Sequence, residues 1–359
     1  MPGGVRSVHH SRMQLTKRVL ARLKSPYPLG LLALDGKQCV VGSTEDHGPV
    51  VMAAPPYDEA IEIVPGPGGC MALVPDAERP GELYAIMGCF PGYKFQTGAI
   101  YRIGREAGQW TRTKLADLPF AHRIDFVTRG GNRYLMAATL AADKSDPSDW
   151  SRPGTLYACR VPRQPEEQWS LVPVLENIHR NHGLLVQRFE GRRSILVSGT
   201  EGLFASNLEQ PGGSWAFKTV LRDEVSEVVV LDVDGDGEDE LITIEPFHGN
   251  FLRVYKRFPG RYEKAWEGEI AFGHGLLAGR LGGAPSILVS NRAESRDLLL
   301  FQFPQGTRPS GRGLSEPTRT VVDPGAGAAN MLILSHNGED RIFSTNQSAG
   351  EIAVYSAAP

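Results

Sequence analysis

The sequence lacks several features that mark particular classes of protein. Four cysteines in 359 residues, with no C-x-x-C spacing, do not form a disulfide scaffold. We therefore expect free thiols in a reducing compartment. No apolar run reaches the roughly 18 residues that span a bilayer, and the first residues lack the apolar segment of a secretory signal. These absences predict a cytoplasmic protein that does not act in a membrane.

The chain also has little excess of charge of either sign. The chain has 38 Lys and Arg against 41 Asp and Glu, and no basic stripe stands out. A nucleic-acid-binding face needs such a concentration of positive charge, so we expect no nucleic-acid partner. The sequence has no G-x-S-x-G, Walker loop, H-E-x-x-H or dinucleotide fingerprint. Their absence argues against serine-hydrolase, nucleotide and Rossmann chemistry.

Glycine and proline, by contrast, occur along the whole sequence, with 41 and 26 residues. This distribution is typical of many short strands joined by tight turns. A four-stranded unit recurs seven times, and its first strand is a short apolar run. These runs begin near Leu29, Cys70, His122, His182, Glu227, His274 and Asn330. A sevenfold repeat of this length predicts an all-β fold, a seven-bladed β-propeller that takes residues 1–359 as a single domain. A two-sheet sandwich would explain many strands but not the sevenfold register.

The last unit has room for only three strands. Residues 15–23, LTKRVLARL, match the pattern of the outer strands and precede the first unit. We expect them to be the fourth strand of the last blade. This pairing closes the ring with a strand from each end of the chain and removes exposed strand edges.

The first residues of the seven inner strands predict a metal site. The innermost strand of each blade lines the central channel, so residues at equivalent positions point toward the same axis. Three of the seven are histidines, His122, His182 and His274, and a fourth is Glu227, in a chain with only 9 histidines. This set suits Zn²⁺, Mn²⁺ or Fe²⁺ with a position left open. Histidines that hydrogen-bond around a solvated channel, and an enzyme without metal, are the alternatives.

The loops between second and third strands open on the same face as these histidines. They contain His47, Tyr93, Lys94, Arg292 and, in EPFHGN, His248. Singly, each is an ordinary loop residue. As a group around a metal they would offer an acid, a base and anion-stabilising groups.

A further motif, DVDGDGEDE, lies in the fifth unit. It resembles the FG-GAP/VCBS family of propeller repeats at one blade of seven. The resemblance implies calcium-binding oxygens on Asp232, Asp234, Asp236 and Glu240, in a structural site on the face opposite the histidines. A turn of Asp and Gly without an ion is the alternative.

Together with HRIDF, NHG, EPFHGN and FGHG, this loop is similar to the propeller of aldos-2-ulose dehydratases and 1,5-anhydrofructose dehydratases. Propeller polysaccharide lyases are a looser likeness. The resemblance implies a carbon–oxygen lyase in which the metal polarises the carbonyl of a keto-sugar, a small carbohydrate substrate, and water or an alkoxide is eliminated. In this hypothesis His248 is the base, His47 or Tyr93 the acid, and Arg292 or Lys94 orients the substrate.

Two other functions fit the same repeats. The first is a noncatalytic FG-GAP-like propeller that presents its loop face to a protein or a glycan. The second is a metal-dependent hydrolase that activates water. The oligomeric state is not predicted by the sequence.

Overall fold

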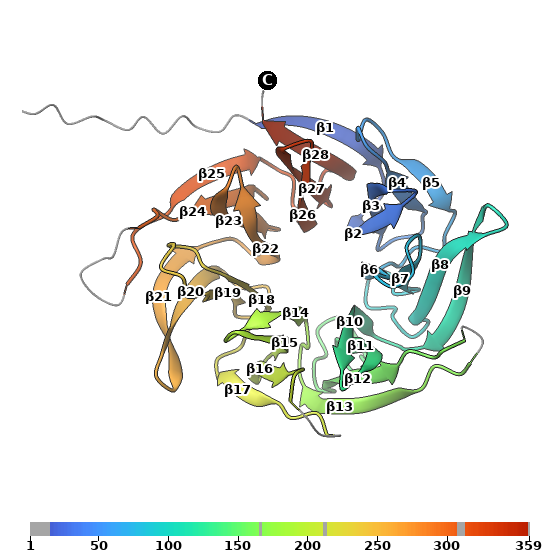
Figure 1. Cartoon of the computed structure of the whole chain (residues 1–359), viewed down its shortest axis with the longest axis horizontal. Helices are drawn as coiled ribbons and strands as arrows, with labels where there is room; N and C mark the ends of the chain where they lie inside the picture. The colour runs from blue at the N-terminus through green and yellow to red at the C-terminus, as the bar shows by residue number, and fades with distance from the viewer. Residues whose placement is uncertain (1–14, 165–166, 211–213, 307–312, 358–359) are drawn as a thin grey trace, which may run out of the picture.

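The chain folds into seven four-stranded sheets set around a central axis (Figure 1). The computed structural model describes residues 15–164, 167–210, 214–306 and 313–357. Within these ranges there are 28 strands and no helix. The predicted all-β fold, a seven-bladed propeller, is confirmed.

The blades follow one another along the chain. The first consists of β2 (Pro26–Leu34), β3 (Lys37–Thr44), β4 (Val50–Ala53) and β5 (Ile61–Val64), and the second of β6 (Ala72–Pro75), β7 (Leu83–Met87), β8 (Ala99–Glu106) and β9 (Gln109–Asp117). The third consists of β10 (Ala121–Arg129), β11 (Asn132–Thr139), β12 (Gly154–Arg160) and β13 (Leu171–Ile178), and the fourth of β14 (Gly183–Phe189), β15 (Arg192–Gly199), β16 (Gly202–Asn207) and β17 (Lys218–Leu221). The fifth consists of β18 (Glu227–Leu231), β19 (Glu240–Glu245), β20 (Phe251–Phe258) and β21 (Arg261–Glu269), and the sixth of β22 (Gly273–Leu281), β23 (Ala284–Asn291), β24 (Leu298–Gln302) and β25 (Thr318–Asp323).

The seventh blade joins the two ends of the described chain. It contains β26 (Ala328–His336), β27 (Glu339–Asn346), β28 (Glu351–Ala357) and β1 (Leu15–Arg22). β1 pairs antiparallel with β28, as the sequence predicted, and ends one residue before the predicted boundary. Leu20 of β1 is buried among side chains of the seventh and first blades, which fixes the strand by packing as well as by hydrogen bonds.

Tight turns explain why the inner hairpins form locally. In five blades a two-residue turn joins the first two strands, and both of its residues have positive φ, as type I′ turns require. These turns are Asp35-Gly36, Gly130-Gly131, Glu190-Gly191, Gly282-Gly283 and Asn337-Gly338. The backbone twist of such turns matches that of the strands, so the hairpin register is set by residues adjacent in sequence.

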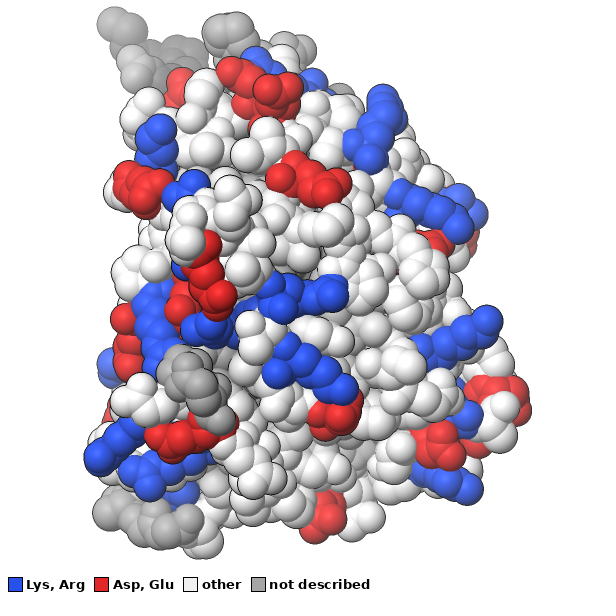
Figure 2. Space-filling view, turned by 90° about the vertical axis from the view of Figure 1, so that its right-hand side faces the viewer, with Lys and Arg blue, Asp and Glu red and all other residues white. Residues whose placement is uncertain are grey.

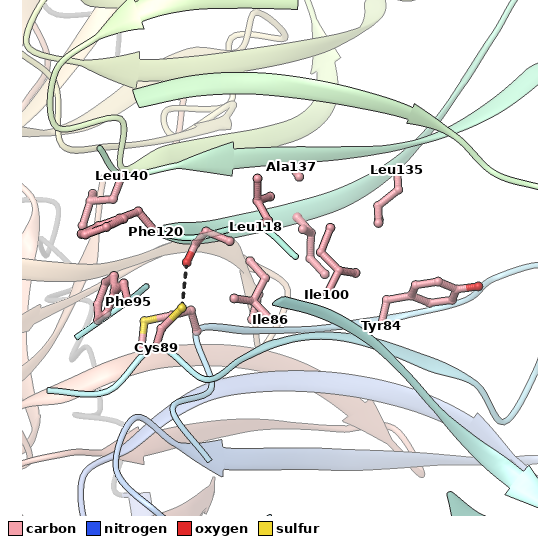
Figure 3. Packing of buried hydrophobic residues seen from close by; sticks show 14 of the residues in the cluster. Tyr84, Ile86, Cys89, Phe95, Ile100, Leu118, Phe120, Leu135, Ala137 and Leu140 are labelled. Carbon is pink, nitrogen blue, oxygen red and sulfur yellow. Dashed lines mark hydrogen bonds between the residues drawn. The ribbon is translucent and has the colours of Figure 1, made fainter. Parts of the chain in front are cut away.

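The core lies between neighbouring blades. Figure 3 shows the cluster between the second and third blades, where Ile86 and Ile100 face Leu135 and Ala137. The thiol of Cys89 donates to the carbonyl oxygen of Ala121 at 3.5 Å in the same layer. All four cysteines are buried and free, as expected.

The outer surface seen in Figure 2 carries Lys and Arg interspersed with Asp and Glu, without a broad field of one sign. Among the described residues no helix is long and apolar enough to cross a membrane.

Candidate functional site

A pocket of about 430 Å³ opens where the inner strands approach the propeller axis. Loops and strand ends of several blades contribute to it. Its lining includes Tyr27, Tyr93, His122, His182, His248, Phe272, His274 and Arg292. Such a concave site with a few converging polar groups is the usual form of a binding site.

The three histidines predicted from the inner strands meet in this pocket. His122 lies on β10, His182 directly precedes β14 and His274 lies on β22. The ring centres of His122 and His182 are 4.4 Å apart, and those of His182 and His274 are 5.4 Å apart. Residues from three different blades therefore share one point, as sevenfold wrapping requires.

A fourth histidine joins this group from a loop. His248 follows β19, and its Nε2 atom lies 3.3 Å from Nε2 of His182. Its ring stacks on Phe247 with 4.0 Å between centres. His248 is held at φ 46°, a region that non-glycine residues seldom adopt and that often marks functional loops. The sequence hypothesis gave His248 the role of a base and did not count it among the ligands.

Glu227 lies next to the histidines but is engaged by two partners. Arg123 donates to its Oε1 atom at 2.6 Å, and Nδ1 of His182 lies 2.7 Å from the same oxygen. Burial by itself would raise the pKa of Glu227, but Arg123 and His182 outweigh burial and lower it. Glu227 is therefore a carboxylate that orients His182. Arg123, in the HRIDF segment, was missed because only His122 was considered there.

Tyr27 is the second residue that the sequence did not reveal. Its hydroxyl lies 3.1 Å from Nε2 of His122 and 3.2 Å from Nε2 of His274. Alignment by apolar runs placed Leu29 at this position. Strand pairing corrects this assignment. Pro26↔Thr44 and Gly273↔Asn291 are the first residue pairs of their hairpins. Tyr27 and His274 each follow the first paired residue by one position, so they are equivalent. Leu29 packs instead in the core between the seventh and first blades.

The pocket keeps its imidazoles neutral. Burial lowers the pKa of His122, His248 and His274 well below the usual value, and positive charges on Arg123 and Arg292 add to this effect. Burial also lowers the pKa of His182, although Glu227 opposes it. The pocket therefore offers uncharged nitrogen atoms.

The predicted loop residues divide into two groups. His248, Tyr93 and Arg292 line the pocket. His47 and Lys94 are exposed and are not part of its lining. The ring of His47 stacks on Phe90 with 4.2 Å between centres. Lys94 sits in a short turn closed by backbone hydrogen bonds to Phe90.

The acidic loop of the fifth blade already contains a positive charge. Nζ of Lys256, on β20, lies 2.7 Å from Asp234, 2.6 Å from Asp236 and 3.3 Å from Glu240. Asp232 accepts hydrogen bonds from the backbone of Gly235 and Gly237. An ammonium group thus stands where the resemblance implies calcium. Calcium binding by these four residues stays a prediction.

Lys256→Met is expected to lower the free energy of unfolding by roughly 2 kcal/mol, because it removes charge-assisted hydrogen bonds and leaves carboxylates close together. Millimolar Ca²⁺ should then raise the stability of the variant more than that of the wild type, since the ion can replace the lysine. Urea denaturation with CaCl2 or MgCl2 measures this. Lys264→Met, on the adjacent β21, is the control. Equal stabilisation of wild type and variant by Ca²⁺ would show that Lys256 does not occupy the cation position.

Comparison with known proteins places the chain among β-propellers. No family model and no curated protein matches it. A chain in the crystal structure of the mitotic checkpoint complex matches with a TM-score of 0.60 and 9% identity, covering 100% of this chain and 96% of that one. The β-propeller domain of Cps50 (Swd1) from Myceliophteria thermophila matches with a TM-score of 0.59 and 10% identity, covering 96% and 100%. Sqt1 from Saccharomyces cerevisiae matches with a TM-score of 0.53 and 12% identity, covering 96% and 100%.

These findings correct the functional hypothesis. The three structures described above are WD40-type propellers, and none is named as a dehydratase, a lyase or another sugar-processing enzyme. The prediction of a carbon–oxygen lyase with a small carbohydrate substrate is wrong on this comparison. The likeness to dehydratase propellers and to FG-GAP repeats rested on short segments, mainly one Asp-Gly turn and several His-Gly pairs. The fold was predicted correctly, and no comparison supports the finer assignment to the FG-GAP or dehydratase propellers.

Proposed function

We propose that this protein is a noncatalytic propeller that binds a protein partner on the face containing the pocket. WD40-type propellers are interaction scaffolds, and one of the matching chains belongs to a multiprotein assembly, the mitotic checkpoint complex. Likeness at about 10% identity concerns the fold, so the choice of face and of contact residues is argued from this chain.

The observation that carries the proposal is an exposed aromatic side chain at the pocket. Phe272 lines the pocket and is 41% exposed, whereas most large apolar side chains among the described residues are buried. Its ring centre is 5.0 Å from that of His248. Aromatic side chains beside a concavity are the usual anchors of protein interfaces, because covering them removes much apolar area from water.

The surroundings of Phe272 have the composition of an interface centre. Tyr93 and Arg292 line the same pocket. On one side, Lys144 lies 3.1 Å from the ring centre of Trp150 and 3.9 Å from that of Tyr93. Aromatic residues and arginine are enriched where interfaces are fully desolvated. We infer a partner segment that places an apolar side chain against Phe272 and a carboxylate near Arg292.

Phe272→Ala is expected to weaken binding of the partner by about 30-fold, the effect of losing about 2 kcal/mol at an interface centre. Proteins recovered with tagged wild type and with Phe272→Ala are compared by quantitative mass spectrometry. Val172→Ala is the matched control, because Val172 is 57% exposed on β13, the outermost strand of its blade. A protein recovered with wild type and control but lost with Phe272→Ala is then purified and titrated.

Dissociation constants measured with the purified partner test the proposal. The proposal requires near-equal dissociation constants for wild type and Val172→Ala, and a much larger one for Phe272→Ala. If wild type, Phe272→Ala and Val172→Ala recover the same proteins, or if only Val172→Ala loses a protein, the interface does not lie at Phe272.

A further inference from the structure

Beyond protein binding, we propose that His182, His248 and His274 together bind one divalent transition-metal ion, with its remaining coordination position open to the pocket. One ring nitrogen of each lies within 4.8 Å of a ring nitrogen of each of the others. His182 and His274 are almost fully buried, His248 is half-buried, and all three residues line the pocket. This set differs from that predicted from sequence, because it includes His248 and omits His122 and Glu227.

The spacing of the nitrogens fits a metal. Zinc binds imidazole nitrogen at about 2.0–2.1 Å, which places two ligands of a tetrahedral site about 3.3 Å apart. The two Nε2 atoms of His182 and His248 are separated by 3.3 Å. A small inward shift of His274 completes a triangle of ligands around one ion.

An acceptor oxygen lies close to Nδ1 on the far side of two of the rings. Nδ1 of His274 lies 3.2 Å from the carbonyl oxygen of Ala329, and Nδ1 of His182 lies 2.7 Å from the carboxylate of Glu227. The carbonyl oxygen can only accept, so Nδ1 of His274 carries the proton and its Nε2 presents a lone pair. The carboxylate close to Nδ1 of His182 favours the same tautomer there, through its charge and not through a hydrogen bond. Carboxylate and carbonyl partners behind metal-bound histidines fix the tautomer in this way in metalloproteins.

The two omitted residues are placed differently. His122 is not in the group of three histidines whose ring nitrogens lie within 4.8 Å of one another, and Glu227 accepts from Arg123. Each supports a ligand without being one. Glu227 orients His182, and His122 holds Tyr27 beside His274. Three neutral imidazoles favour Zn²⁺, Co²⁺, Ni²⁺ or Cu²⁺ over Mg²⁺ and Ca²⁺, which prefer oxygen ligands.

The test uses the full chain, stripped with a chelator and titrated with CoCl2. We expect one Co²⁺ per chain and a visible absorption band of a low-coordinate cobalt ion, displaced by Zn²⁺. His248→Ala should bind Co²⁺ roughly 100-fold more weakly, because a ligand is lost, while its circular dichroism spectrum remains that of the wild type.

Two matched variants separate this site from its neighbours. His47→Ala, exposed and outside the pocket lining, should bind Co²⁺ within a few-fold of wild type, whereas His122→Gln, at a residue that supports a ligand without being one, should weaken binding less than His248→Ala does. If the wild type binds no Co²⁺, the proposal is overturned, and the contact between His182 and His248 is only a hydrogen bond. Unchanged binding by His248→Ala, or loss in His122→Gln with retention in His248→Ala, would overturn it as well.

Discussion

Deletion of residues 1–23 is expected to abolish cooperative unfolding of the propeller. The deletion removes β1, whose register with β28 runs from Leu15↔Ala357 to Arg22↔Glu351. It also removes Leu20 from the core, and Lys17, which pairs with Asp323 at 2.7 Å and with Glu351. β28 would become an open edge next to a partly uncovered core, and such edges recruit other chains.

Removal of residues 1–14 is the matched control, since these residues precede β1 and lie outside the described part of the chain. Urea denaturation followed by tryptophan fluorescence, with sedimentation to detect aggregates, compares the two truncations. The shorter truncation should keep the sharp transition of the full chain. A sharp transition at the same urea concentration in the longer truncation would show that β1 does not close the ring.

Glu227→Ala is expected to reduce the free energy of unfolding by about 3–5 kcal/mol, the cost of leaving a buried charge without its partner. The side chains of Arg123 and Glu227 are only 16% and 13% exposed, and they pair at 2.6 Å. Alanine would leave the largely buried Arg123 guanidinium with no carboxylate. His182 would also lose the oxygen that orients it.

A surface pair is the control for this change. Arg18 and Asp58 form an ion pair whose side chains are 57% and 60% exposed, so Asp58→Ala should cost no more than about 1 kcal/mol. In addition, Arg123→Met with Glu227→Met should be less destabilising than Glu227→Ala alone, because no charge is left uncompensated. Urea titration of all variants measures these differences. A cost for Glu227→Ala similar to that of Asp58→Ala would mean that water already solvates Arg123.

The fold could be predicted because each blade is specified locally. Five inner hairpins are closed by two-residue turns such as Asn337-Gly338, and the apolar runs on either side of each turn have the length of a strand. The closing strand was predictable because the last unit has room for only three of the four strands that the other units contain. The convergence of His122, His182 and His274 followed from the repeat itself, since equivalent positions in a ring point to its axis.

The rest of the site could not be predicted because it depends on irregular backbone. Tyr27 was hidden by a register shift between Pro26 and Leu29, which moves the residue at the axis away from the apolar run. His248 comes from a loop with φ 46°, and no periodic pattern reports where such a loop turns. Lys256 reaches the acidic loop across strands, so the motif DVDGDGEDE alone could not show that a cation was already present.

Site-specific photo-crosslinking tests the protein-binding face most directly. A photoreactive phenylalanine analogue replaces Phe272 in one full-length variant and Val172 in a second, each produced in cells that contain the natural partners. We predict a discrete crosslinked product from position 272 that position 172 does not form. Identical products from both positions, or a product from position 172 alone, would contradict a partner seated on the pocket.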